Sequence, residues 1–439
     1  MTPDHFARRM DRLSAEAGVA SGPVAIGLSG GGDSLALLLH MSQWAKTRDR
    51  ALHAIIVDHA LRDESALEAL DAAQHAARMG ASAHILRWGH ARPGQKLARE
   101  ARHDLFAKAC TRLGIKLLCL GHTLDDQAET LWMRIIRGVE GKGLTGMTAL
   151  SPSPSWPLGR DLWIARPLLD QAREDLRDVL RQNKLKWVDD PSNDNAFYER
   201  VRARRSLKGF QDQGLELTPL GEFADQNREP DNAARLEAIN FTHRSVTLYR
   251  WGGFSVDREA FARLSENAQT LLLEGVLLGI SGQRGPVPAP TIRAFRNWIL
   301  QGEAGTGFGV HITEKGVMGR DPGAVSGRRD GMAGLIPFAL SEGACGIWDG
   351  RFFIRAKTTL LVRPCKRQDD RDPDNPLWGA EAKIPPALRQ SLGVCVAEGE
   401  NLQGVMGAEG PVADIEWLGW ERLQRSLLCV HPLAWFDVV

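Results

Sequence analysis

The sequence has few cysteines, and none of them are paired. The six stand singly, at Cys110, Cys119, Cys345, Cys365, Cys395 and Cys429. Zinc knuckles and iron–sulfur clusters take their thiolates from closely spaced cysteine pairs, so neither kind of centre is indicated. We expect these residues to be reduced thiols that are mostly buried or unreactive.

Long apolar runs are also missing. A membrane-spanning helix needs roughly 18 or more consecutive apolar residues, and the sequence has no such stretch. The most apolar stretch of the C-terminal half, 271–280, is interrupted by Glu274. The N-terminal residues mix both signs of charge and lack the apolar core of a signal peptide. We therefore expect a cytoplasmic protein that does not associate with a membrane.

Neither sign of charge is in excess. The chain carries 55 Lys and Arg against 54 Asp and Glu, a formal net charge of +1. This excludes a chain that is basic throughout, but not a local basic surface that binds nucleic acid. With 43% apolar and 25% charged residues the composition is that of a globular protein, which excludes global disorder. The 439 residues suggest about three domains.

Strand-like and helix-like patterns alternate through the first 140 residues. Short apolar runs are separated by segments of ten or more residues with helical periodicity. This alternation predicts an α/β domain with a parallel sheet and helices on both faces, in which ligands bind at the carboxyl ends of the strands. The predicted strands are 24–28, 52–57, 82–88 and 115–120, and the predicted helices are 34–45, 64–79, 96–113 and 125–137.

The rest of the chain changes character in steps. Residues 138–160 are rich in Gly, Pro and Ser and predict an exposed loop. A strand at 163–169 and a helix at 171–183 follow. Residues 216–300 have a helical pattern, whereas 331–439 look β-rich, with many Gly, Pro and Trp. We predict domains at 1–215, 216–330 (mainly helical) and 331–439 (small and β-rich).

A glycine-rich turn follows the first strand. Three consecutive glycines allow the backbone to turn its N–H groups inward, and the following helix points the positive end of its dipole at the same place. This is an anion cradle suited to nucleotide phosphates, although such a turn can also be only a tight connection. It matches neither the Walker A pattern nor G-x-G-x-x-G. The residues are Ser29, Gly30, Gly31, Gly32, Asp33 and Ser34.

Two side chains of this turn have distinct expected roles. Bare phosphate repels a carboxylate, so Asp33 is expected to hold Mg²⁺ against the phosphates. The hydroxyl of Ser34 can donate to a phosphate oxygen or cap the helix.

The S-G-G-x-D-S pattern resembles the PP-loop of the ATP pyrophosphatase superfamily, whose members cleave ATP between the α and β phosphates. Further motifs make the resemblance more specific, and together they resemble the tRNA(Ile)-lysidine synthetase family over about residues 24–208. Residues 216–439 contribute only a similar architecture. The motifs are VDHALR (57–62), AREARH (98–103), GHTLDDQAET (121–130), Arg137-Gly138, GLTGM (143–147), RPLL (166–169), DPSN (190–193), Arg200 and Arg204.

This resemblance implies a defined reaction. ATP adenylates the C2 oxygen of the wobble cytidine of a tRNA(Ile) with a CAU anticodon. The ε-amino group of free L-lysine then attacks C2 and AMP leaves. The product, lysidine, reads AUA instead of AUG and gives the tRNA isoleucine identity. The cofactors are then ATP and Mg²⁺, and the two C-terminal domains are expected to bind tRNA.

The resemblance also implies site residues. Asp33 corresponds to the catalytic, metal-associated aspartate, and Arg99 can stabilise charge on the α-phosphate together with the loop amides. A pocket for cationic lysine needs carboxylates, and Asp126 is the first choice for contact with lysine or metal. The other members of this pocket are Asp125, Glu129 and His122. Asp125 and Glu129 are four apart and share a helix face, although acidic residues there can also only complement the helix dipole, and His122 can be structural.

Basic residues near the predicted site favour tRNA phosphates as a ligand. The dense run that includes Arg200, Arg204 and Arg205 forms the expected track, which Arg134 and Arg137 can extend. The run can also be only a solvated helix face. Two residues depart from the family pattern: Thr123 stands where a second histidine is common, and His103 where tyrosine is frequent. A monomer and a homodimer are both left open.

Three other functions are conceivable for a chain with such a loop, and the sequence argues against each. A PP-loop enzyme that thiolates a tRNA base usually needs paired cysteines to carry sulfur. An amidotransferase-linked ligase, such as GMP or asparagine synthetase, needs a glutaminase domain with a catalytic cysteine. A non-catalytic RNA-binding protein on a decayed PP-loop scaffold is expected to have lost the glycines, Asp33 or the acidic helix start, all of which are intact.

Overall fold

The computed structural model describes most of the chain in two compact units, Met1–Asp231 and Asn232–Val430. The whole DPSN motif (190–193) and most of VDHALR lie outside the described residues. No helix in the described residues is long and apolar enough to cross a membrane. The described residues are 1–58, 65–88, 95–139, 144–188, 199–214, 216–327, 333–366, 384–397, 404–405 and 412–427.

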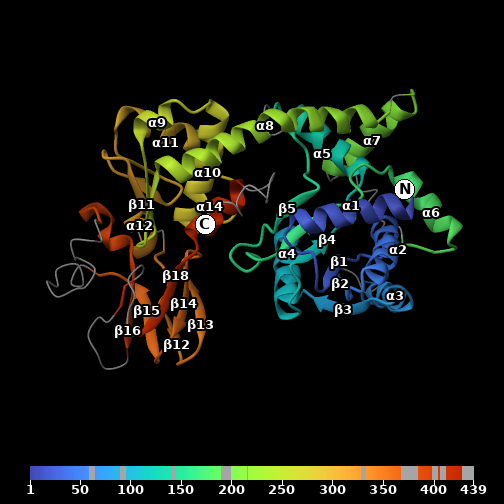
Figure 1. Ribbon diagram of the computed structural model, residues 1–439, viewed down its shortest axis with the longest axis horizontal. Coiled ribbons are helices and arrows are strands. Elements are labelled where there is room, and N and C mark those ends of the chain that lie inside the picture. Colours follow the sequence, from blue (N-terminus) through green and yellow to red (C-terminus); the bar gives the residue numbers. More distant parts are fainter. Residues whose placement is uncertain are drawn as a thin grey trace. The chain divides into compact units, whose positions relative to one another are not determined.

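The first unit is built on a six-stranded sheet with the order β3-β2-β1-β4-β6-β5. All neighbouring strands pair in parallel except β5, which runs antiparallel to β6 at one edge. This confirms the predicted α/β class with a parallel sheet (Figure 1). The strands are β1 (Val24–Gly27), β2 (Leu52–Asp58), β3 (Ser82–Arg87), β4 (Leu117–Cys119), β5 (Leu150–Pro152) and β6 (Trp163–Ala165).

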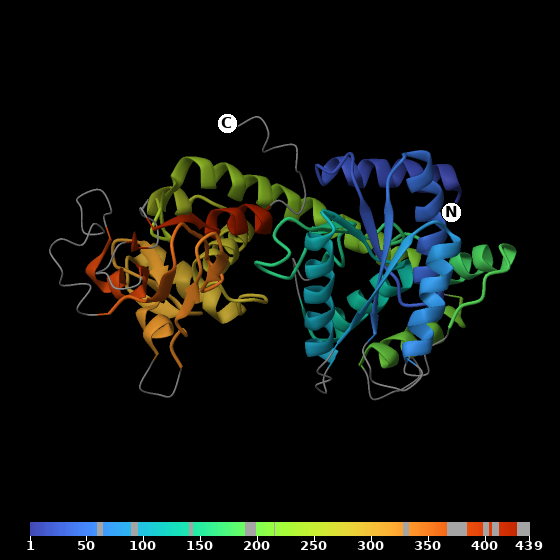
Figure 2. The same cartoon turned by 90° about the horizontal axis from the view of Figure 1, so that it is seen from below.

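Helices cover both faces of this sheet, as the apolar strands require. Side chains alternate between the faces along each strand: Val24 and Ile26 of β1 join one apolar core, and Ala25 joins the other. Helices α1 (Pro3–Glu16), α2 (Gly32–Thr47), α3 (Ser65–Arg78) and α6 (Arg173–Gln182) supply the first core, and α4 (Gln95–Arg112) supplies the second. Figure 2 shows α4 on one side of the sheet and α2 with α3 on the other.

The strand order places a topological switch point between β1 and β4. The chain moves from β1 to β2 and β3 on one side, then returns to β4 on the other. Loops that leave β1 and β4 at their carboxyl ends diverge there, which is where open α/β sheets bind ligands. The glycine-rich turn follows β1, and α5 (Leu124–Ile136) follows β4. α7 (Glu199–Gln211) packs against α5 through Ala128 and Leu207.

One predicted segment differs from the structure. Residues 138–160 were predicted to be an exposed loop, but they contain the edge strand β5, and Ser155 and Trp156 are buried. The Ser- and Pro-rich composition is that of a loop, whereas the antiparallel pairing to β6 supplies the backbone hydrogen bonds. A strand of three residues has too few positions for its alternation to be detected.

The second unit combines helices with three antiparallel sheets, β7-β8-β11-β10-β9, β12-β15-β16-β17 and β13-β14-β18. The helical and β-rich character predicted after residue 215 is present, but the five-stranded sheet within 246–320 was not predicted. The division into three domains stays a prediction. The helix α8 (Thr218–Ser245) begins in the first unit and ends in the second. The other helices of the second unit are α9 (Arg258–Ala262), α10 (Glu266–Ser281), α11 (Ala289–Gln301), α12 (Pro322–Ser326), η4 (Pro386–Ser391) and α14 (Gly419–Leu427).

The strands of the second unit are short. They are β7 (Val246–Tyr249), β8 (Gly253–Val256), β9 (Gly305–Gly307), β10 (Val310–Ile312), β11 (Val317–Arg320), β12 (Phe338–Leu340), β13 (Cys345–Trp348), β14 (Phe352–Ala356), β15 (Leu360–Pro364), β16 (Gly393–Ala397), β17 (Gly404–Val405) and β18 (Ala413–Trp417).

Candidate active site

The glycine-rich turn forms a closed loop at the carboxyl end of β1. Gly30 has a φ of +82°, a conformation that favours glycine. The Ser34 hydroxyl donates to the Gly31 carbonyl at 2.9 Å and accepts from the Ser29 N–H at 3.2 Å. Ser34 therefore braces the loop from within. α2 begins at Gly32 without a side-chain cap, and the first N–H groups of a helix are available to an anion.

The start of α5 lies directly against this loop. A Cβ added at Gly121, just after β4, would lie 3.0 Å from the backbone oxygen of Asp33. Only a residue without a side chain allows such close backbone approach. The segment that carries His122, Thr123 and α5 is therefore fixed next to the phosphate loop.

Thr123 and Asp126 form a capping box at the N-terminus of α5. The Asp126 carboxylate accepts from the Thr123 N–H at 2.9 Å, and the Thr123 hydroxyl accepts from the Asp126 N–H at 3.4 Å. Thr123, which departs from the family pattern, thus acts as a helix cap. One oxygen of Asp126 is used in this cap, which leaves the other for contacts within the site.

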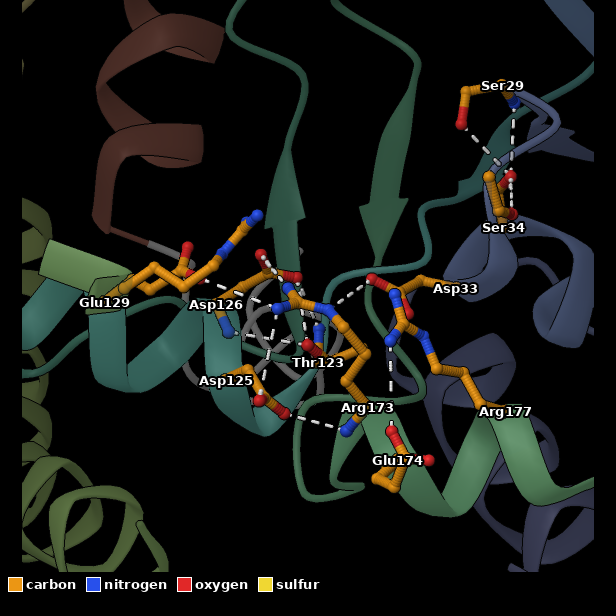
Figure 3. A network of polar contacts seen from close by, with 12 residues as sticks. Ser29, Asp33, Ser34, Thr123, Asp125, Asp126, Glu129, Arg173, Glu174 and Arg177 are labelled. Atoms are coloured by element: carbon orange, nitrogen blue, oxygen red, sulfur yellow. Dashed lines mark hydrogen bonds and ion pairs between the residues drawn. The ribbon is translucent and has the colours of Figure 1, made fainter. Parts of the chain in front are cut away.

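Arg173, at the first position of α6, reaches into the centre of the acidic residues (Figure 3). Its Nε donates to Asp33 Oδ2 at 3.0 Å, and its Nη2 donates to the free oxygen of Asp126 at 3.2 Å. Its Nη1 lies 3.6 Å from Glu129 and 4.0 Å from Asp125. The four predicted acidic residues therefore do converge, and a guanidinium lies among them.

Asp125 has a second, separate contact. Its Oδ2 accepts from the backbone N–H of Arg173 at 2.7 Å, which caps the otherwise uncapped start of α6. The Leu124 N–H also donates to the Gln171 carbonyl at 2.9 Å. These bonds connect the N-termini of α5 and α6 and fix the backbone from which Arg173 extends.

Glu129 is the most buried of the four carboxylates, with 1% of its side chain exposed. Its two oxygens accept from Arg200 Nε at 2.6 Å and Arg204 Nε at 2.7 Å, and both arginines come from α7. Arg200 also donates to Asp126 at 2.7 Å. These pairs bring α7 onto α5, so Arg200 and Arg204 point into the acidic cluster.

The pKa values of the carboxylates reflect these surroundings. Burial raises the pKa of Asp33, while Arg173 opposes the shift. Burial also opposes ionisation of Asp126, but the charges of Arg200 and Arg173 outweigh it and the pKa of Asp126 is lowered. Burial acts against the charge of Arg173 too, yet Asp126 and Asp33 raise its pKa. Asp126 and Arg173 therefore form a charged pair inside the site.

A second group of residues next to this cluster is cationic. Burial lowers the pKa values of Arg99, Arg102 and Arg134, and repulsion between arginines lowers them further. No hydrogen bond or ion pair of Arg99 or Arg102 is found among the described residues. Concentrated positive charge is the usual setting of an anion site.

The two histidines of this region are neutral. Burial lowers the pKa of His122 to about 3 and that of His103 to about 4. His103 is buried and packs edge-on against Phe106, with ring centroids 6.2 Å apart. Within the described part of the chain, Nδ1 of each ring has no hydrogen-bond partner. The charge of Asp126 acts on His122, which indicates that His122 lies next to the acidic cluster.

The remaining predicted tRNA ligands lie at the edges of the site. Arg137 and Glu199 form an exposed ion pair, with Nε and Oε1 2.9 Å apart, which connects the end of α5 to the start of α7. Arg134 donates to the Gly146 carbonyl at 3.3 Å. Arg205 is exposed on α7. The structure thus separates Arg200 and Arg204, which face the carboxylates, from Arg205. Their roles in tRNA binding stay predictions.

Sequence reasoning missed Arg173. It lies four residues beyond the RPLL motif, at the first position of a helix. A cation at a helix N-terminus opposes the helix dipole unless carboxylates compensate for it. That local conflict is the signal that could have identified the residue.

Comparison with known proteins identifies the family. A PP-loop domain family model matches residues 2–209. A tRNA(Ile)-lysidine synthase of Caulobacter vibrioides is 33% identical over 398 residues, which cover 89% of this chain and 86% of that protein. The chain belongs to the tRNA(Ile)-lysidine synthase family. The Brucella anthropi tRNA(Ile)-lysidine synthase is 34% identical over 363 residues, 80% of this chain and 77% of that protein.

A further tRNA(Ile)-lysidine synthase is more alike over a shorter stretch. The member from Hyphomonas neptunium is 50% identical over 185 residues, which cover 42% of this chain and 50% of that protein. The Caulobacter vibrioides and Brucella anthropi proteins extend the match through most of the second unit. The family suggested by the motifs at 24–208 is therefore confirmed, and it extends to the C-terminal half.

Proposed function

We propose that the chain converts the wobble cytidine of a tRNA(Ile) with a CAU anticodon to lysidine. The C2 oxygen of the cytidine attacks the α-phosphorus of ATP and pyrophosphate leaves. The ε-amino group of free L-lysine then forms a bond to C2, loses a proton, and displaces AMP. The modified tRNA then reads the codon AUA instead of AUG. Membership of the tRNA(Ile)-lysidine synthase family supports this reaction.

One observation in the site carries the proposal. A phosphate-loop geometry and a cluster of four carboxylates meet at one switch point, and a guanidinium already lies in the centre of that cluster. The cluster is therefore built to hold a cationic nitrogen group. A nucleotide bound at the loop and an amine bound at the cluster would be neighbours, as the reaction requires.

The nucleotide half is formed by the turn and Asp33. The N–H groups at the start of α2 can bind phosphate oxygens. Mg²⁺ takes oxygen ligands, commonly one or two carboxylates plus phosphates and water. Asp33, a carboxylate beside the loop, fits that pattern, and its Oδ2 is bonded to Arg173. Bound there, Mg²⁺ would neutralise charge at the α–β phosphoanhydride.

The amine half is formed by α5. Asp125, Asp126 and Glu129 offer oxygens on adjoining turns, and each is in contact with a positively charged group. His122 is neutral at physiological pH because burial lowers its pKa to about 3. Its unprotonated ring nitrogen can accept a hydrogen bond from the incoming amine. These are the residues that we assign to lysine.

The cationic group on the other side of the site suits phosphate. Arg99 and Arg102 come from the first turns of α4, and Arg134 comes from α5. We assign Arg99 to the charge that develops on the α-phosphate. The neighbouring arginines would accept the phosphate of the wobble nucleotide.

The tRNA has to extend well beyond this site. We propose that Arg205 and Arg137 contact its backbone, and that the regions 216–330 and 331–439 read bases outside the anticodon. Such reading is needed because the CAU anticodon is shared with the methionine tRNAs. We further propose a cytoplasmic enzyme that acts without a membrane.

Release of AMP and pyrophosphate tests the proposal. The full chain is incubated with ATP, Mg²⁺, L-lysine and a tRNA(Ile) transcript with a CAU anticodon, and each component is omitted in turn. We expect AMP and pyrophosphate in equal amounts, both dependent on the tRNA. Asp33→Asn is the matched variant and is expected to release neither. ADP and phosphate as products, or AMP release that does not need the tRNA, would contradict the proposed chemistry.

A further inference from the structure

Arg173 touches both halves of the site. Its Nε contacts Asp33, which we assign to the nucleotide, and its two terminal nitrogens approach the α5 carboxylates, which we assign to the amine. Figure 3 shows the side chain rising from the start of α6 between these two groups. Arg200 reaches Asp126 and Glu129, but Asp33 is not among its contacts in the described residues. Arg173 is therefore the bridge between the halves.

The guanidinium occupies acceptors that lysine needs. One oxygen of Asp126 is used by the helix cap, and the other is shared by Arg173 and Arg200. Both oxygens of Glu129 are bonded to arginines. An ammonium group that enters this cluster must therefore compete with a bound guanidinium. This step rests on the proposed function, since it assumes that the cluster receives lysine.

We propose that Arg173 is a positioning residue that makes lysine binding depend on the nucleotide. While its Nε is bonded to Asp33, the guanidinium is held over the α5 carboxylates and blocks the amine. When Asp33 is engaged by a magnesium nucleotide, Arg173 loses that acceptor, and the phosphates offer it a stronger one. The side chain then gives up its share of the Asp126 oxygen and the space beside Asp125 and Glu129 to the amine, while Arg200 and Arg204 stay in place.

The local backbone allows this movement without a change of fold. The Arg173 N–H is bonded to Asp125 Oδ2 at 2.7 Å, and the Leu124 N–H to the Gln171 carbonyl at 2.9 Å. These two bonds hold the start of α6 independently of the Arg173 side chain. Rotation of one long side chain is therefore sufficient. Ordered binding follows: the acceptor pocket opens only after the nucleotide is in place.

The test measures binding instead of turnover. Isothermal titration gives the Kd of L-lysine for the full chain, without nucleotide and with Mg²⁺ and α,β-methylene-ATP. In the wild type we expect the nucleotide to tighten lysine binding by about tenfold, within the range usual for coupled sites. In Arg173→Met we expect lysine to bind several-fold more tightly than in the wild type without nucleotide. The nucleotide should then change its Kd by less than about twofold.

Arg200→Met is the matched control. It removes the same charge from the same cluster but leaves the contact with Asp33 intact, so the nucleotide should still tighten lysine binding by about tenfold. Arg173→Lys keeps the positive charge and replaces Arg173→Met in the test if the latter fails to fold. In Arg173→Lys we expect the nucleotide to tighten lysine binding by less than in the wild type.

An Arg173→Met or Arg173→Lys variant with the full nucleotide effect overturns the inference. So does an Arg173→Met variant that binds lysine more weakly than the wild type without nucleotide, because Arg173 would then be a lysine contact. A wild type that binds nucleotide but no lysine under either condition overturns both this inference and the proposed function. Lysine binding with unchanged coupling in all variants overturns only the inference.

Discussion

Replacing Glu129 by glutamine is the most stringent test of how the described site is held together. It is 1% exposed, and its two oxygens pair with Arg200 and Arg204 at 2.6 and 2.7 Å. Glu129→Gln keeps the size of the side chain and removes its charge. Arg200 retains Asp126 as a partner, whereas Arg204 loses the one ion-pair partner that it has among the described residues. The contact that brings α7 onto α5 is therefore weakened from both sides.

The expected cost follows from burial. Removing one partner of a fully buried ion pair costs about 3–5 kcal/mol. The side chains of Arg200 and Arg204 are 37% and 35% exposed, so solvent screens part of that loss and we expect about 2–3 kcal/mol. For a unit of this size, that free energy corresponds to a fall in Tm of about 5–10 °C.

Calorimetry of the full chain measures this change, and Glu199→Gln is its control. Glu199 pairs with Arg137 at the other end of the same two helices, but both side chains are exposed, so its loss should cost less than about 1 kcal/mol. Equal shifts of Tm in the two variants would refute the reasoning. The Glu129 network would then contribute no more to stability than the exposed ion pair of Glu199.

Three further predictions concern chemistry, tRNA and pH. Asp33→Ala should abolish product while filter binding gives nearly unchanged tRNA affinity; retained turnover would remove Asp33 from the mechanism. Neutralising Arg205 should lower the slope of log K against log salt by about 1, whereas Arg204→Ala should change it less, because Arg204 faces Glu129; equal slopes in the two variants would contradict these assignments. Burial lowers the pKa of His40 to about 4. As the pH falls from 6.5 toward 4, His40 is therefore protonated in the unfolded chain before it is protonated in the folded one, and the free energy of unfolding decreases. His40→Leu should remove up to about 3 kcal/mol of that loss, and urea unfolding at pH 7 and 4.5 that gives the same pH dependence for both proteins would contradict it.

Much of the first unit could be predicted from the sequence because its signals are local. The apolar run at 52–57 and the helical pattern at 96–113 agree with β2 and α4 to within one residue at either end. The sheet of β7 to β11 could not be predicted, since its strands have three or four residues and alternation over so few positions is not informative.

The site was predictable only in part for a related reason. Asp33 and Asp126 could be placed together because both follow strands at the same edge of a parallel sheet. The contact of Arg173 with Asp33 spans 140 residues of sequence, and no local pattern encodes it. The same holds for Arg200 and Arg204: their charge suggested a tRNA surface, whereas their partners on α5 became visible only in three dimensions.

Transfer of labelled lysine to tRNA tests the central claim most directly. The full chain is incubated with ATP, Mg²⁺, radiolabelled L-lysine and either a tRNA(Ile) transcript with a CAU anticodon or elongator tRNA(Met). The account predicts acid-stable label in the isoleucine tRNA alone, with one AMP formed for each lysine incorporated. AMP formation without label, or with another nucleophile in place of lysine, would keep the nucleotide chemistry and contradict the assignment of the acidic cluster to lysine.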